Sequence, residues 1–279
     1  MTDITAQPMP TKPPRSQWRN VWDQFRHHRG AMITFLLIVA GVVIGPFIYW
    51  NDPKFVPTGR DFLTLRDMRP IYVALWDPSA KVDWAYPLGT DNLGRDTLGR
   101  LLLGGRVSIA VGLTAMILAL FLGTLIGLVA GYFKRLDGPL MRLTDLFLAL
   151  PILPMIIVRG DVLALKEREF VLAARSLGTR NRKLISRHIL PNVLSPIMVS
   201  ATLGIATAII TESALSFLGF GFPPDFPTWG KLLNDAVDRM VLYPERVVWP
   251  GLAISITVLA VNYLGDGLRD ALDPRIRGR

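Results

Sequence analysis

The chain of 279 residues contains no cysteine and only three histidines, two of which, His27 and His28, lie in a basic N-terminal stretch. Without cysteine, neither a disulfide framework nor a cysteine-ligated metal site can form, and so few histidines exclude an ordinary catalytic metal centre. The chain also lacks the Gly-x-x-x-x-Gly-Lys-Ser/Thr loop that cradles phosphates. No Ser/His/Asp constellation or carboxylate pair can be argued, so the sequence predicts a protein that is not itself an enzyme and holds no metal.

Apolar residues, by contrast, make up 51% of the chain, and its mean hydropathy is +0.36 although it carries 31 Lys and Arg. Several runs of about 20 residues are nearly free of charge, which a multispan membrane protein needs and a soluble domain of this length does not. The net charge of +9 could indicate a nucleic-acid partner, but the cations cluster beside the apolar runs. We therefore expect a lipid bilayer, and no nucleic acid, around this chain.

The first apolar run, residues 30–50, ends in Tyr49 and Trp50, the aromatic pair expected at a membrane–water interface. It is too long for the apolar part of a signal peptide and no small-residue cleavage site follows, so we predict a retained helix. Four more apolar runs occupy residues 107–132, 146–158, 189–220 and 249–264.

Glycine and proline modify two of these runs. Gly123, Gly127 and Gly131 are four residues apart and predict one helix face that permits close helix contact. Pro191 and Pro196 fall within the run 189–220, where we expect them to break the helix.

Positive charge is unevenly distributed between these runs. Lys and Arg outnumber acidic residues five to two in 1–29, three to one in 133–142 and eight to three in 159–188, and four Arg follow residue 266. Residues 51–100 are balanced at seven and seven, and residues 221–247 hold three cations and four acids. The excess of cations in cytoplasmic loops places the first group of segments, and hence both termini, in the cytoplasm.

This assignment contains a contradiction, because only the apolar run 146–158 separates the cytoplasmic stretches 133–142 and 159–188. One crossing would place 159–188 outside, and two crossings need roughly 40 residues. We predict that roughly 25 to 30 residues are missing after Val158, with a chain discontinuity between Val158 and Arg159. Either this sequence lacks a stretch that the native protein has, or the natural chain has lost it.

The most specific pattern is a basic, helix-compatible stretch between two apolar runs. Ala173, Ala174 and Gly178 form a small-residue patch at helical spacing, followed at a fixed distance by Leu190 and Pro191. Small side chains on one helix face leave a shallow surface into which another protein can pack, and the surrounding cations keep the stretch in the cytoplasm. An ordinary basic loop, with alanines for helix propensity, is the alternative interpretation.

This stretch resembles the cytoplasmic coupling loop of ABC-importer permeases. The family pattern is Glu-Ala-Ala, three residues, Gly, nine residues and Ile-x-Leu-Pro, from which this chain departs with Leu172 in place of Glu and His188 in place of Ile. The resemblance implies that coupling to an ATPase subunit involves Arg168, Glu169, Ala173, Ala174, Gly178, Arg180, Leu190 and Pro191.

Three further motifs resemble the second permease subunit of dipeptide, oligopeptide and nickel importers. They are Pro87-Leu-Gly-Thr-Asp-Asn-Leu-Gly-Arg-Asp, then Leu215-Ser-Phe-Leu-Gly-Phe-Gly-Phe-Pro-Pro with Pro227-Thr-Trp-Gly, and Gly265-Asp-Gly-Leu-Arg-Asp-Ala-Leu-Asp-Pro-Arg. The first predicts an amphipathic helix at the outer membrane face with Arg95 and Arg100 exposed, for which anchoring alone is an equal interpretation. The third predicts a short amphipathic helix along the inner membrane surface.

The second motif cannot continue a regular helix through its glycines and prolines, so the backbone must turn there. Broken backbone at membrane depth persists only where protein or a water-filled cavity covers it, which indicates a re-entrant segment and a pore constriction. A plain loop at the membrane surface is the alternative, as are helix packing for Glu212 and lipid contact for Phe217. The pathway and gate candidates are Glu212, Ser216, Phe217 and Gly219.

The resemblance implies an all-α polytopic bundle of the type I ABC-importer permease kind with six transmembrane helices, one span of which is missing after Val158. The expected divisions are a cytoplasmic tail at 1–29, a first helix at 30–50, an extracytoplasmic segment with the interfacial helix at 51–106, a permease core at 107–265 with the coupling loop 159–188, and a cytoplasmic tail at 266–279.

The function implied is that of a channel-forming permease subunit in the bacterial inner membrane, importing dipeptides or oligopeptides that an extracytoplasmic binding protein delivers. Its partners would be a homologous permease and two ATP-binding subunits, which would hold the ATP and Mg²⁺, so this chain itself needs no cofactor. Nickel chelates, glutathione and opines are alternative substrates.

A secondary transporter driven by an ion gradient is the alternative class of protein, but the spans show no matching repeats with coupling carboxylates. An ABC exporter half would carry long cytoplasmic helical extensions that are absent here.

Overall fold

The computed structural model describes residues 59–146, 153–223 and 226–272, together with a few single positions between 30 and 40. The predicted N-terminal tail, most of the predicted first span and the last seven residues of the predicted C-terminal tail therefore lie outside the described residues. Inside them the chain is helical, with turns and one isolated bridge between Thr90 and Asp96.

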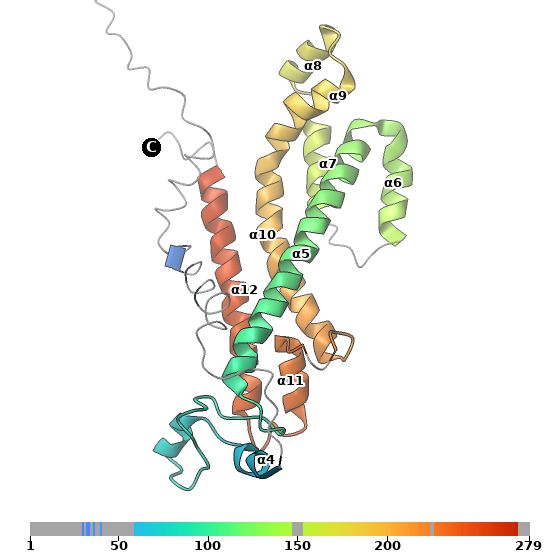
Figure 1. Cartoon of the computed structure of the whole chain (residues 1–279). Helices are drawn as coiled ribbons and strands as arrows, with labels where there is room; N and C mark the ends of the chain where they lie inside the picture. Colours follow the sequence, from blue (N-terminus) through green and yellow to red (C-terminus); the bar gives the residue numbers. More distant parts are fainter. Residues whose placement is uncertain are drawn as a thin grey trace, which may run out of the picture.

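The helices lie along one long axis (Figure 1). In chain order they are α4 (Gly59–Leu65), the 3-10 helix η2 (Ile71–Leu75), α5 (Thr97–Tyr132), α6 (Lys134–Leu146), α7 (Leu153–Leu165), α8 (Glu169–Ser176), α9 (Asn181–Leu184), the π-helix η3 (Ile185–Ile189), α10 (Leu190–Phe217), α11 (Trp229–Val237) and α12 (Glu245–Leu272). Figure 1 shows α8 and α9 at one end, called the α8 end below, and α4 and α11 near the opposite one, called the α4 end.

Three helices of the described residues are long and apolar enough to cross a membrane. They are Thr97–Tyr132, Pro196–Phe217 and Glu245–Gly267. With only helices in the described part, this confirms the prediction of an all-α polytopic membrane protein. The described residues contain three of the expected six spans. Most of the predicted first span lies outside them, and α7, with 13 residues, is too short to be another. Such a helix is about 20 Å long, against roughly 30 Å of hydrocarbon.

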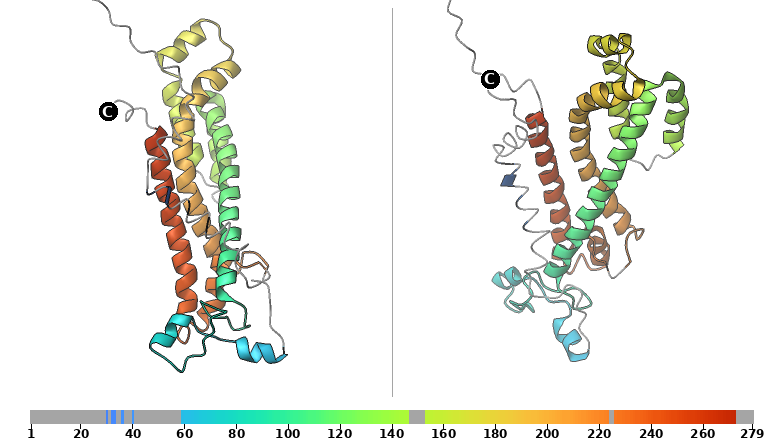
Figure 2. Two further views of the ribbon diagram at one scale, coloured as in Figure 1. Left: turned by 60° about the vertical axis from the view of Figure 1, so that its left-hand side comes forward. Right: turned by 45° about the horizontal axis from the view of Figure 1, so that its top comes forward.

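Helix α6 starts at the α8 end and packs against α5, and α7, which packs against α5 and α10, leads back to that end (Figure 1 and Figure 2). The two helices are linked by Arg159, whose Nε and Nη2 both donate to the carboxylate of Asp137 at 2.6 Å. These hydrogen bonds lower the pKa of Asp137, which lies in the first turn of α6 outside the three spans. The basic stretches before α6 and after α7 thus lie at one end of the described structure, as the charge count requires.

The predicted discontinuity after Val158 is wrong. Val158 and Arg159 are consecutive residues of the continuous helix α7, and Val158 is fully buried against α5 and α10. The charge count required only that the basic stretches share one end, and α7 meets this requirement as a single short helix. The predicted coupling loop 159–188 is also shorter than expected, since α7 continues to Leu165.

The glycine face of α5 makes the contact that the spacing predicted. A Cβ added at Gly127 would meet the Met155 carbonyl oxygen at 2.8 Å and the Val158 Cβ at 2.9 Å. At Gly131 it would meet Val162 Cβ at 2.8 Å. The backbones of α5 and α7 therefore approach closely because these positions carry no side chain.

The prediction of a separate interfacial helix with Arg95 and Arg100 exposed is wrong. Helix α5 runs without interruption from Thr97, so the expected boundary between 106 and 107 falls inside it. Arg100 is 3% exposed and pairs with Asp91 at 2.8 Å and Asp235 at 3.4 Å, while Arg95 pairs with Asp91 at 2.7 Å. The arginines bury because their carboxylate partners bury with them.

Two further expectations about helix ends are corrected. The run 189–220 is not broken by its prolines, since Pro191 lies in the first turn of α10 and Pro196 lies inside it. The last span also continues through Gly265 to Leu272, so the C-terminal motif extends α12 and does not begin a separate helix within the described residues. The predicted break after Phe217 is confirmed, because α10 ends there and Gly219 adopts φ +86°.

Gly127→Ala tests the contact between α5 and α7. The added methyl group would overlap α7 and should lower the free energy of unfolding by about 1–3 kcal/mol. Gly160→Ala is the matched control in α7, because nothing lies within 4 Å of its added Cβ. It should leave stability unchanged or raise it by about 0.5–1 kcal/mol. Thermal unfolding of the purified protein in detergent measures both, and equal stability of the two variants would refute the contact.

Candidate functional site

Helix α8 forms the centre of the candidate site, and its sequence explains where it starts and how it is oriented. Glu169 lies in its first turn and Arg175 in its last, both favourable positions in the field of the helix dipole. Val171 is 2% exposed and holds one face of α8 against the bundle. Ala173, two residues further and hence roughly opposite on a helix, is exposed.

The outward face of α8 carries the exposed polar residues Glu169 and Ser176 with apolar side chains around them. Phe170 is 45% exposed, Leu172 42% and Leu177 87%. Ala173 lies among them and Gly178 follows, both exposed, while Ala174 is half-buried. Apolar side chains that no described residue covers are the arrangement expected of a surface that packs against another protein.

Gly178 ends α8 by its backbone conformation. It adopts φ +78°, and its N–H donates to Arg175 O at 3.0 Å while the Thr179 N–H donates to Ala174 O at 3.2 Å. These two hydrogen bonds satisfy carbonyl groups that the end of the helix leaves free, and the left-handed conformation favours glycine. The fixed glycine of the motif therefore terminates the helix, a role that the small-residue interpretation missed.

Residues outside the motif hold α8 and α9 on the end of α5. The Tyr132 hydroxyl donates to Asn181 Oδ1 at 2.7 Å, and Lys166 Nζ donates to Gly131 O at 3.3 Å. Leu184 of α9 is fully buried. The sequence analysis missed these anchors, although Val171 and Leu184 are apolar positions within a basic stretch, the signal that would have indicated them.

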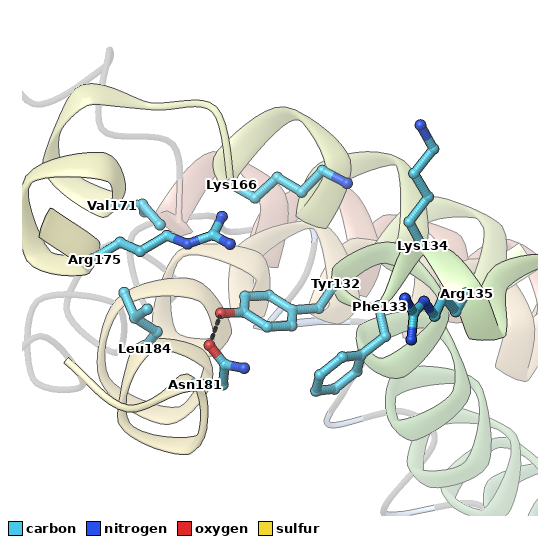
Figure 3. Close-up of a pocket in the computed structure, with 9 residues that line it drawn as sticks. All are labelled: Tyr132, Phe133, Lys134, Arg135, Lys166, Val171, Arg175, Asn181 and Leu184. Carbon is cyan, nitrogen blue, oxygen red and sulfur yellow. Dashed lines mark hydrogen bonds between the residues drawn. The ribbon is translucent and has the colours of Figure 1, made fainter. Parts of the chain in front are cut away.

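A pocket of about 240 Å³ lies between α8, α9 and the junction of α5 with α6 (Figure 3). Its lining consists of Tyr132, Phe133, Lys134, Arg135, Lys166, Val171, Arg175, Asn181 and Leu184. Figure 3 shows the hydrogen bond between Tyr132 and Asn181 among the lining residues.

The Leu-Pro part of the motif connects α9 to α10. Pro191 has no N–H, and the π-helix η3 directly before α10 accommodates the loss of a helical hydrogen bond. Asn192 Nδ2 donates to His188 O at 2.6 Å and satisfies a carbonyl group of this turn. Leu190 packs against the buried cluster of α5, α7 and α10. Arg168 and Arg180 are exposed at the starts of α8 and α9.

The pathway candidates lie together at the other end of α10, with different surroundings. Glu212 is 8% exposed, and its Oε1 accepts a hydrogen bond from Ser216 Oγ at 2.7 Å, while its buried Oε2 has no partner among the described residues. Phe217 is 38% exposed, and Asn234 of α11 donates to its carbonyl at 2.9 Å. Gly219 is exposed after the helix end.

The chain matches two family models. Residues 152–278 match the "Binding-protein-dependent transport system inner membrane component", and residues 16–66 match the "N-terminal TM domain of oligopeptide transport permease C". The chain is 37% identical over 293 residues to the glutathione transport system permease protein of Shigella sonnei, covering 95% of this chain and 92% of that protein. It is 35% identical over 307 residues to the dipeptide transport system permease protein of Alkalihalophilus pseudofirmus, covering 97% and 96%.

The fold and these matches define an ABC-importer permease, a multi-pass inner-membrane component. Within that class, the chain belongs to the dipeptide and oligopeptide permease family. The alignment with the Shigella sonnei protein is 293 positions long, whereas 95% of 279 residues is about 265, so about 28 positions have no residue of this chain. This agrees in size with the segment that the charge count indicated, although the chain itself is continuous.

Gly178→Ala tests the glycine at the end of α8. Nothing lies within 4 Å of the added Cβ, so the cost arises from backbone conformation alone. The amides of the last turn of α8 should open about 5- to 30-fold more often, which corresponds to about 1–2 kcal/mol for a left-handed alanine. Hydrogen–deuterium exchange measures this opening.

Gly178→Asn should open less than Gly178→Ala, because asparagine tolerates the left-handed conformation better. The matched control is Gly138→Ala in α6, where nothing lies within 4 Å of the added Cβ and φ is not positive. Unchanged exchange in Gly178→Ala would contradict the role given to this glycine.

Proposed function

We propose that this chain is a channel-forming permease that imports short peptides and is driven by ATPase subunits docked on the exposed face of α8. The observation that supports this most strongly is the geometry of α8. Buried Val171 fixes the helix to the bundle, while Ala173 and its apolar neighbours face outward. A partner that pushes on this face moves a helix rigidly attached to the membrane spans.

The substrate class is supported by the relatives. They are named for glutathione and for dipeptides. Both are small molecules with peptide bonds and free carboxylates, so a short peptide fits either relationship. Nickel chelates and opines are not among the names of these relatives. Delivery by an extracytoplasmic binding protein agrees with the family description of a binding-protein-dependent system.

The proposed assembly pairs this chain with a homologous permease and two ATP-binding subunits, which hold the ATP and Mg²⁺. Translocation would pass the break after α10, with Phe217 as gate and Gly219 as its flexible neighbour. Buried Glu212 and Ser216 would support the gate from behind through their hydrogen bond. The α8 end and both termini would be cytoplasmic, as the excess of Lys and Arg there indicates.

Ala173→Trp tests the docking face. Because Ala173 is exposed, the substitution should leave the membrane fold intact while a bulky ring prevents α8 from seating on its partner. Binding-protein-stimulated ATP hydrolysis and uptake of labelled dipeptide or glutathione by the reconstituted complex should fall about tenfold or more, as for a central interface residue.

Gly138→Trp is the matched control for Ala173→Trp, since it adds equal bulk at the same end where nothing lies within 4 Å of the Cβ. It should retain both activities. If Ala173→Trp retains ATPase stimulation and uptake, α8 is not the coupling element.

Cysteine labelling tests the orientation, since this sequence of 279 residues contains no cysteine to interfere. Leu75→Cys at the α4 end replaces a side chain that is 84% exposed, and Gly138→Cys places a thiol in open space near the α8 end. A membrane-impermeant maleimide should label Leu75→Cys in intact spheroplasts and Gly138→Cys only in inside-out vesicles. The reverse pattern would overturn the orientation.

A further inference from the structure

The pocket at the α8 end has an unusual charge. Its lining contains four cations and two aromatic rings, and no carboxylate. The cations come from separate elements, since Lys134 and Arg135 begin α6, Lys166 follows α7 and Arg175 lies on α8. Arg175 lies on the side of α8 that carries buried Val171, close to it around the helix and away from the proposed docking face.

None of these four cations takes part in an ion pair within the described residues. Lys166 lies near enough to Asp137 to contribute to the lowered pKa of that carboxyl, but forms no ion pair with it. Asp137, the acid in the first turn of α6, uses both carboxylate oxygens for Arg159. The α4 end is different, because there Arg95, Arg100 and Lys231 share Asp91 and Asp235. The unpaired charge is therefore a local property of the pocket.

The start of α6 adds to the positive potential. Lys134 and Arg135 lie in its first turn, where the helix dipole is positive and cations are unfavourable. Helix N-termini with free N–H groups favour anions. An anion in the pocket would interact favourably with the side-chain cations and with this helix terminus together.

The donors of the pocket suit a phosphate group. The Arg175 guanidinium offers a planar fork of N–H groups, which matches phosphate geometry. Lys166 makes one hydrogen bond, to Gly131 O, and an ammonium group has three donors. Figure 3 shows Arg175 near the hydrogen bond from Tyr132 to Asn181, which fixes the positions of these two lining side chains.

We propose that this pocket binds a phosphate group, carried by the headgroup of an anionic phospholipid or by free inorganic phosphate. Its place at the ends of membrane helices favours the lipid. Phe133 in the lining is 38% exposed, and Phe121 and Leu125 are 68% and 53% exposed on the face of α5 that leads from Tyr132 toward the membrane. Basic pockets between such helices bind anionic headgroups, and exposed apolar side chains along α5 can contact the acyl chains. The site goes beyond the proposed function and does not depend on the substrate.

Native mass spectrometry of the purified complex with its ATPase subunits tests the proposal. The wild-type complex is titrated with phosphatidylglycerol, with phosphatidylcholine of the same chains, and with inorganic phosphate. Retention of phosphatidylglycerol over phosphatidylcholine identifies a lipid headgroup. Phosphate adducts without lipid preference identify free phosphate. If the wild type shows neither, the proposal is wrong whatever the variants do.

The double variant Lys166→Gln/Arg175→Gln locates the site. At about fivefold per cation removed, its retention of the bound anion should be roughly 25-fold weaker. Arg182→Gln/Lys183→Gln is the matched control, because it removes the same charge from exposed residues of α9 outside the lining. It should bind as the wild type does.

Equal loss in the test and control variants would show a general charge effect and overturn the site. If the test variant instead sheds its ATPase subunits while retaining the lipid, the pocket is a protein contact and the proposal fails. Should that variant not assemble, Lys134→Gln/Arg135→Gln from α6 replaces it with the same expected loss. Transport and ATP coupling are scored separately with Ala173→Trp, so failure of one proposal leaves the other intact.

Discussion

The close contact between α5 and α7 determines how the α8 end is built. Because Gly127 and Gly131 carry no side chain, α7 lies directly on α5, and the two helices end at the same level. The chain leaving α7 therefore starts α8 beside Tyr132, within reach of the anchors Val171 and Leu184. A larger residue in this contact would move α7, and every feature of the α8 end would move with it.

The two ends of the bundle differ in how their charged side chains are paired. At the α4 end, Asp67 accepts from Arg239 and Arg246 at 2.9 and 3.0 Å, and residues far apart in the chain are held together. Buried pairs of this kind stabilise only as complete sets, since removing one partner leaves an uncompensated charge. At the α8 end, the cations of the pocket have no such partners among the described residues. The α4 end is held together by ion pairs within the chain, whereas the pocket at the α8 end carries cations that remain available to a partner or ligand.

The sequence predicted the features that depend on local spacing. The glycine face of α5, the helix at 169–176 and the break after Phe217 all follow from residues within a few turns. It could not predict the burial of Arg100, because its partner Asp235 lies 135 positions further along the chain. Charge counting placed the basic stretches at one end but could not predict that α7 runs unbroken through Val158 and Arg159, since a count of charges does not depend on chain continuity. The hydrogen bond between Tyr132 and Asn181 could not be predicted, because it joins residues that only the fold brings together.

The unbroken path from α9 through η3 into α10 has a mechanical consequence. These elements follow one another without a gap from Asn181 to Phe217, and α10 alone is about 42 Å long. The helix crosses α5 most tightly where Gly112 meets Ile209 and Gly204 meets Met116, which lie nearer to Phe217 than to α9. Were the helix to pivot at this crossing, its unequal arms would turn a swing of α9 into a smaller displacement at the break after Phe217.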